Sequence, residues 1–205
     1  MCKLTIKNQV IALFVMCFLM FSGANVSAND FSANTNDALL NRAIILTESI
    51  NSSVMRVLQG ENSTGQPVRV KFANLSTISP DYMSADAVTI IGDDGRMTIY
   101  IDKALSNSPP EAIACLLEHE TTHNDSKSSI EEEVVAWTKE ATTWNYFTRK
   151  KPSLAKLDES QYQLVDRLNY LLELYKKAGN SSIAIRQEVL ANGMYTNLAM
   201  HSEKY

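Results

Sequence analysis

The chain is organised around the segment Leu116-Leu117-Glu118-His119-Glu120-Thr121-Thr122-His123, in which two histidines lie four residues apart around a glutamate. Pro109 and Pro110 precede it, and proline is favoured in the first turn of a helix. Four residues make just over one helical turn, so the imidazoles of His119 and His123 project from the same face and can bind one metal ion. We therefore predict a helix that carries a metal site.

Glu120 is the predicted catalytic residue of this site. Each helical residue is rotated by about 100° from the one before it, so this carboxylate flanks the metal instead of binding it. From there it can accept a proton from a metal-bound water as a general base. Two histidines one turn apart also occur on helices that bind no metal, so the rest of the chain must distinguish these two interpretations.

A second helix is predicted from about residue 130 to residue 147, with Ser128 or Ser129 as its N-cap. Its apolar residues gather on one face: Ile130, Val134, Trp137, Ala141 and Trp144. Glu133 lies roughly 50° from the middle of that face on a helical wheel. A carboxylate that borders a buried face needs a partner, and a catalytic zinc ion held by two histidines needs a third protein ligand. We therefore predict Glu133 as that ligand.

Two other carboxylates remain alternative third ligands. Glu132 points away from the apolar face of its helix, and Asp125 lies in the polar turn just past His123. Glu140 falls on the same side of the helix as Glu133, two turns further on. We expect Glu140 on the surface or in a salt bridge, in preference to a role in orienting an imidazole.

A β-hairpin is predicted to lead into the motif helix. Its strands are residues 88–91 and 97–101, and Gly92-Asp93-Asp94-Gly95 supplies the positive φ angles of a tight reversal. The alternating segment 68–72 predicts an earlier, half-buried strand. A strand exposed beside a metal site can hold an extended peptide by main-chain pairing. The alternative is that the hairpin is only scaffold.

Three more helical segments are predicted at residues 37–58, 157–178 and 182–190. The strands precede most of the helices, which indicates an α+β fold: a small sheet and hairpin, then the active-site helix, then a mostly helical C-terminal half. Cys115 lies among apolar neighbours and is predicted to be a buried core thiol.

An N-terminal signal peptide is predicted over residues 1–28. Lys3 and Lys7 form a positive start, and an uncharged apolar run follows from residue 10 to residue 21. Residues 26–28 end in small side chains, as at a signal-peptidase site. The apolar run is short for a transmembrane helix, so we expect a secreted or periplasmic protein without a stable membrane anchor; an uncleaved anchor is the alternative.

The remaining residues, 29–205, are predicted to form a single domain, since a chain of 205 residues is of ordinary one-domain size. The net charge is -4. Acidic residues outnumber basic ones, so the chain has no excess of positive charge with which to bind nucleic acid, and we expect no nucleic-acid partner.

The chain from about residue 88 to residue 147 resembles the core of the zincin metallopeptidases, in particular the small gluzincins with a short spacer. The matching pieces are the strand Met97-Thr98-Ile99-Tyr100-Ile101, the motif His119-Glu120-Thr121-Thr122-His123, and the next helix with Glu133-Val134-Val135-Ala136. A metzincin would have its third histidine at position 129, where this chain has Ser129. The longer-spaced glutamate motif of larger gluzincins is absent from the sequence.

The resemblance implies a zincin-like fold in which His119, His123 and Glu133 bind Zn²⁺ and Glu120 is the general base. The implied function is that of an exported zinc metallopeptidase, which hydrolyses a peptide or protein substrate through a metal-activated water. The alternatives are a catalytically inactive, zincin-like module that binds zinc or another protein, and a structural helical protein with a chance motif. The sequence does not choose the group that would stabilise an oxyanion: an arginine, Tyr146, Tyr162, Tyr170 or Tyr195.

Overall fold

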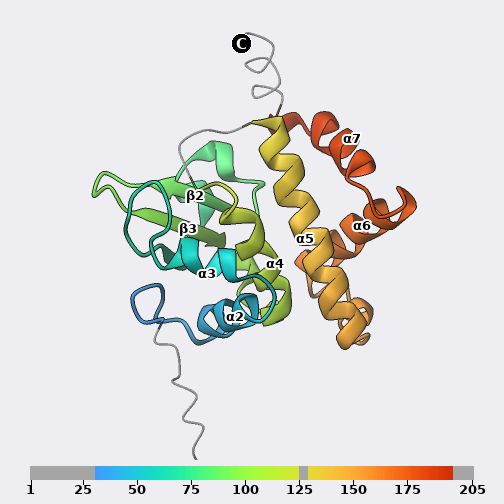
Figure 1. The fold of residues 1–205 in the computed structure, drawn as a ribbon, viewed down its shortest axis with the longest axis horizontal. Coiled ribbons are helices and arrows are strands. Elements are labelled where there is room, and N and C mark those ends of the chain that lie inside the picture. Colours follow the sequence, from blue (N-terminus) through green and yellow to red (C-terminus); the bar gives the residue numbers. More distant parts are fainter. Residues whose placement is uncertain (1–30, 125–128, 196–205) are drawn as a thin grey trace, which may run out of the picture. The chain divides into compact units, whose positions relative to one another are not determined.

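The computed structural model describes residues 31–124 and 129–195 and has an α+β fold, as predicted (Figure 1). A small mixed sheet precedes the mostly helical C-terminal half. The predicted signal peptide, Asp125 and Ser128 lie outside the described residues. Within the described residues, no helix is both long enough and apolar enough to span a membrane.

The sheet has three strands: β1 (Arg69–Ala73), β2 (Ala87–Ile91) and β3 (Met97–Asp102). β3 is central; it pairs in parallel with β1 and in antiparallel fashion with β2. The β2–β3 hairpin agrees with the predicted one, and Gly95 in its turn has a φ of 69°, which favours glycine. β2 is therefore an edge strand, and one of its two sides faces away from the sheet.

The segment predicted as one helix over residues 37–58 forms two helices, α2 (Ala38–Glu48) and α3 (Ser52–Leu58). Asn51 causes the break, because its side chain accepts a hydrogen bond from the backbone N–H of Ser53 and so caps a new helix.

The motif helix is α4 (Pro110–Glu120), which packs against α2 and α5 (Ile130–Lys150) and can be followed between them in Figure 1. α4 ends one turn earlier than predicted, so His123 lies in the turn just beyond it. Thr122 N–H bonds to the carbonyl of His119 and His123 N–H to that of Glu120, so three-residue spacing replaces the helical spacing of four. This tightened turn still keeps His123 beside the helix.

The C-terminal half consists of α5, α6 (Gln163–Lys177) and α7 (Ile183–Ala191). Both α6 and α7 pack on α5, around a small apolar cluster that includes Ile130, Leu171 and Ile185. α6 begins six residues later than predicted. Short 3₁₀ helices complete the described structure: η1 (Leu75–Thr77), η2 (Pro80–Tyr82), η3 (Lys103–Leu105), η4 (Leu154–Lys156) and η5 (Gly193–Tyr195). Cys115 is fully buried in the main core, as predicted.

Candidate metal centre

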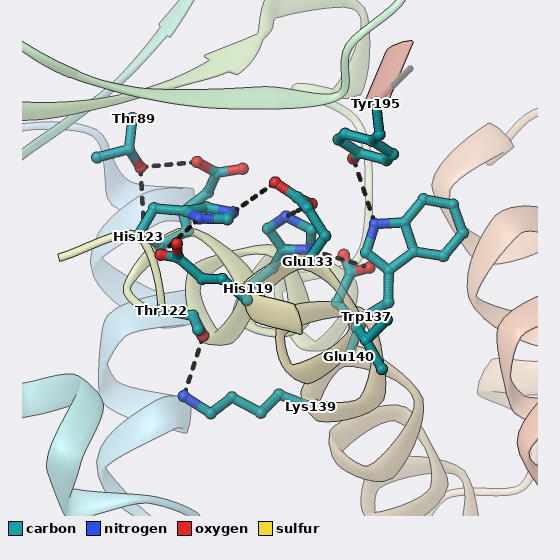
Figure 2. A network of polar contacts seen from close by, with 12 residues as sticks. Thr89, His119, Thr122, His123, Glu133, Trp137, Lys139, Glu140 and Tyr195 are labelled. Carbon is teal, nitrogen blue, oxygen red and sulfur yellow. Dashed lines mark hydrogen bonds and ion pairs between the residues drawn. The ribbon is translucent and has the colours of Figure 1, made fainter. Parts of the chain in front are cut away.

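The structure brings His119, His123 and Glu133 together at one point between α4 and the start of α5 (Figure 2). One potential ligand atom from each residue lies within 4.8 Å of the others. His119 Nε2 is 3.7 Å from Glu133 Oε2, and His123 Nε2 is 3.4 Å from Glu133 Oε1. The three side chains could therefore hold one metal ion between the two Nε2 atoms and the carboxylate.

The other nitrogen of each imidazole faces a different carboxylate. His123 Nδ1 lies 3.0 Å from Glu132 Oε1, and His119 Nδ1 lies 3.5 Å from Glu140 Oε2. A carboxylate at Nδ1 favours the tautomer with its proton on that atom, which leaves Nε2 free to bind a metal. Both imidazoles are thus turned with Nε2 toward Glu133.

The side chains of Glu132 and Glu140 do not lie where helical periodicity indicates. Glu132 reaches the centre because His123 lies in the turn beyond α4, over the first turn of α5. The predicted surface position of Glu140 is wrong, since the side chain is fully buried, and the predicted salt bridge is confirmed. Arg167 of α6 compensates this burial through two hydrogen bonds of 2.8 and 2.6 Å to the Glu140 carboxylate.

Arg167 connects the centre to the segment before the edge strand. Its Nε lies 2.6 Å from Asp86 Oδ2, while its two terminal nitrogens bind Glu140. Burial raises the pKa of Glu140, but the charges of Arg167 and His119, together with the hydrogen bonds from Arg167, outweigh burial and bring this pKa to about 2. Glu140 is therefore a permanent negative charge behind His119.

Glu120 lies beside the predicted ligands without joining them. Its side chain is buried, and the hydroxyl of Thr89 on β2 donates a 2.7 Å hydrogen bond to Glu120 Oε2. Burial raises the pKa of Glu120, and the charges of the two histidines and the Thr89 hydrogen bond only partly oppose this. A carboxyl group with a raised pKa is a stronger base than an ordinary glutamate.

The centre opens into a cleft of about 790 Å³. One wall is the edge strand β2 with the segment before it, and the other comes from the C-terminal half. Of the tyrosines left open as oxyanion-stabilising groups, Tyr195 lines the cleft, and the arginine that lines it is Arg167. Trp137 and Asn192 also line it, although the sequence analysis gave them no role in the site. Local spacing cannot show that Arg167 and Tyr195 meet at this cleft, because they lie in α6 and η5, far from the motif in sequence.

The donor set fits a divalent transition metal. Two imidazoles and one carboxylate are a ligand set of catalytic zinc sites, which leave a further position open. Glu133 Oε2 is buried and has no hydrogen-bond partner among the described residues. A buried, unpaired carboxylate oxygen is costly, and a cation at this point would compensate it.

No family model matches this chain, and no curated protein or solved structure is detectably similar to it. The assignment of a metal centre therefore depends on the geometry of the site.

His119 carries a proton that a metal must displace. Burial lowers the pKa of its imidazole, but the charge of Glu140, 3.5 Å from Nδ1, together with the charges of Glu120 and Glu133, raises it to about 9. A histidine must be neutral at the binding nitrogen to act as a ligand. Below that pH, protons therefore compete with the metal for this site.

We expect the affinity for zinc, used as the probe ion, to rise about tenfold per pH unit between about pH 6 and 8, because one proton is released. Competition titration with a chromophoric chelator measures the affinity, and calorimetry in two buffers counts the protons. Glu140→Gln should flatten the dependence, since it removes the main charge that holds the proton on His119. An affinity that does not change with pH would contradict this assignment.

Proposed function

We propose that this chain is a zinc-dependent peptidase. The observation that supports this most directly is the convergence of His119, His123 and Glu133, with Glu120 beside them, in the lining of an open cleft. A zinc ion at such a site polarises a substrate carbonyl and acidifies water. His119, His123 and Glu133 are the residues that would hold it.

Glu120 is the proposed general base. Its raised pKa favours acceptance of a proton from the attacking water near neutral pH, and the same carboxyl group can then give the proton to the leaving amine. Thr89 fixes Oε2 of Glu120 through its hydroxyl hydrogen bond and so limits rotation of the carboxylate. The base is thereby held in one orientation before substrate arrives.

The edge strand β2 is the proposed peptide-binding element. It lines the cleft along its whole length, from Ala87 to Ile91, and only β3 pairs with it in the described sheet. An extended peptide can add to such an edge through main-chain hydrogen bonds and lie across the metal centre. This arrangement favours a peptide or protein substrate over a small compact one.

We also infer that the protein acts outside the cytoplasm, secreted or periplasmic, as a soluble domain after removal of residues 1–28. The support is the charged, apolar and small-residue pattern of that segment.

The test is the zinc content and peptidase activity of residues 29–205, purified without chelator. We expect about one zinc per chain and hydrolysis of members of a mixed peptide library. Chelation should abolish hydrolysis, and added zinc should restore it. Zinc without hydrolysis of any peptide would contradict the peptidase proposal and favour a binding module. Absence of zinc, even after metal is added, would contradict the metal centre itself.

A further inference from the structure

Tyr195 enters the metal cleft from the C-terminal end of the described structure. It belongs to η5, which follows α7, and it lines the same cleft as Glu133. Its ring packs at a steep angle against Trp137 of α5, with the ring centres 6.1 Å apart. Figure 2 shows Tyr195 and Trp137 together on one side of Glu133, with His123 on the other.

The hydrogen bond between these two rings has only one possible direction. An indole N–H donates and cannot accept, so Trp137 Nε1 donates to the phenol oxygen of Tyr195 across 3.3 Å. The phenol hydrogen is then left for an acceptor. The Glu133 carboxylate lines the same cleft, and burial of the phenol together with the nearby charge of this carboxylate raises the pKa of the phenol well above its ordinary value. The phenol therefore keeps its proton and can donate it.

Glu133 is the ligand for which helical packing alone supplies no orienting partner. Glu140 faces Nδ1 of His119, and Glu132 faces Nδ1 of His123. A carboxylate ligand needs the same support, because its oxygens must face the metal at a fixed angle.

We propose that Tyr195 is the positioning residue of the third metal ligand: Trp137 fixes the phenol, and the phenol O–H holds the Glu133 carboxylate toward the two histidines. This inference depends on the proposed metal centre but not on peptide hydrolysis. It makes the end of the C-terminal helical segment part of the metal centre, although that segment is more than 60 residues away from Glu133 in sequence.

The proposal links metal binding to docking of α7 and η5. α7 packs on α5 and α6 through Ile185 and Val189, and Tyr195 extends this contact to the cleft. A metal that binds Glu133 favours the conformation in which Tyr195 also bonds to it, so metal should protect the backbone amides of residues 183–195 from exchange.

The test compares Tyr195→Phe with Tyr170→Phe in residues 29–205. Tyr170 is a matched control: it is half-exposed on α6, and the nearby Glu188 on α7 raises the pKa of its phenol, outside the cleft. Each variant loses one phenol hydroxyl that lies near a glutamate. We expect Tyr195→Phe to weaken zinc binding by about 10-fold or more, as loss of an orienting partner typically does, and Tyr170→Phe to leave it unchanged.

Two further measurements separate positioning from general packing. Bound Co²⁺ should show a different visible absorption spectrum in Tyr195→Phe, because its carboxylate ligand is reoriented, whereas the melting temperature of the metal-free chain should change little. Trp137→Phe keeps an aromatic ring, removes the N–H, and should change zinc affinity in the same direction. Zinc affinity and cobalt spectrum unaltered in Tyr195→Phe would overturn this role alone. A parent chain that binds no zinc would overturn both this role and the proposed function.

Discussion

Glu120→Gln is expected to reduce peptide hydrolysis by about 10²–10⁴-fold, the usual contribution of a general base, and to leave zinc bound. The amide occupies the space of the carboxyl group and can still accept the hydrogen bond that Thr89 makes to Glu120, but it cannot take up a proton at neutral pH. The geometry of His119, His123 and Glu133 does not depend on this side chain, so the metal should remain.

Glu118→Gln is the matched control for this variant. Glu118 is also a buried glutamate of α4, but it contacts Asn51 on the far side of the helix and does not line the cleft. Steady-state hydrolysis and zinc content are measured for both variants and the parent chain. Hydrolysis retained by Glu120→Gln would remove Glu120 from the mechanism, and loss of zinc in that variant would show that the glutamate binds the metal instead.

The three consecutive glutamates at the start of α5 should give a graded loss of zinc. Glu133→Ala removes a proposed ligand and should weaken binding by more than the roughly 10–100-fold that loss of an orienting partner costs. Glu132→Ala removes the carboxylate that faces Nδ1 of His123, and its loss of zinc affinity should fall within that roughly 10–100-fold range. Glu131→Ala should have no effect, because Glu131 is exposed and pairs with Arg186 outside the cleft.

The three variants control for one another, because each removes one acidic side chain from the same first turn of α5. Competition titration at one pH gives the three affinities, and circular dichroism checks that α5 still forms. If Glu132→Ala lost more zinc than Glu133→Ala, Glu132 would be the ligand. Equal small losses for all three would indicate that only the general negative charge of the turn matters.

The motif itself could be predicted from sequence because its geometry is local. His119 and Glu120 lie on one helix, and His123 lies one tight turn beyond it, so their mutual placement depends on backbone spacing alone. The position of Glu133 also followed from helical periodicity, since it borders the apolar face of α5 that packs inward. The hairpin and the α+β class likewise followed from alternation and turn residues, which act over a few positions.

Contacts between distant elements could not be predicted in this way. Periodicity shows which residues of a helix share a face, but not the neighbour that the face meets. Glu140 is buried because Arg167, 27 residues further along, neutralises it. Its charge would otherwise have required the surface position expected from sequence.

The sequence by itself determined which groups converge at the candidate centre: two imidazoles, a carboxylate that could bind a metal with them, and a second carboxylate beside them, at spacings that helical geometry makes convergent. Tertiary structure alone decided what surrounds them. The packing of α5 against α4 brings Glu132 to His123, that of α6 and α7 against α5 brings Arg167 and Tyr195 to the cleft, and the edge strand supplies Thr89. The physical reason is that these orienting contacts depend on how whole elements bury their apolar faces together, which no local pattern specifies.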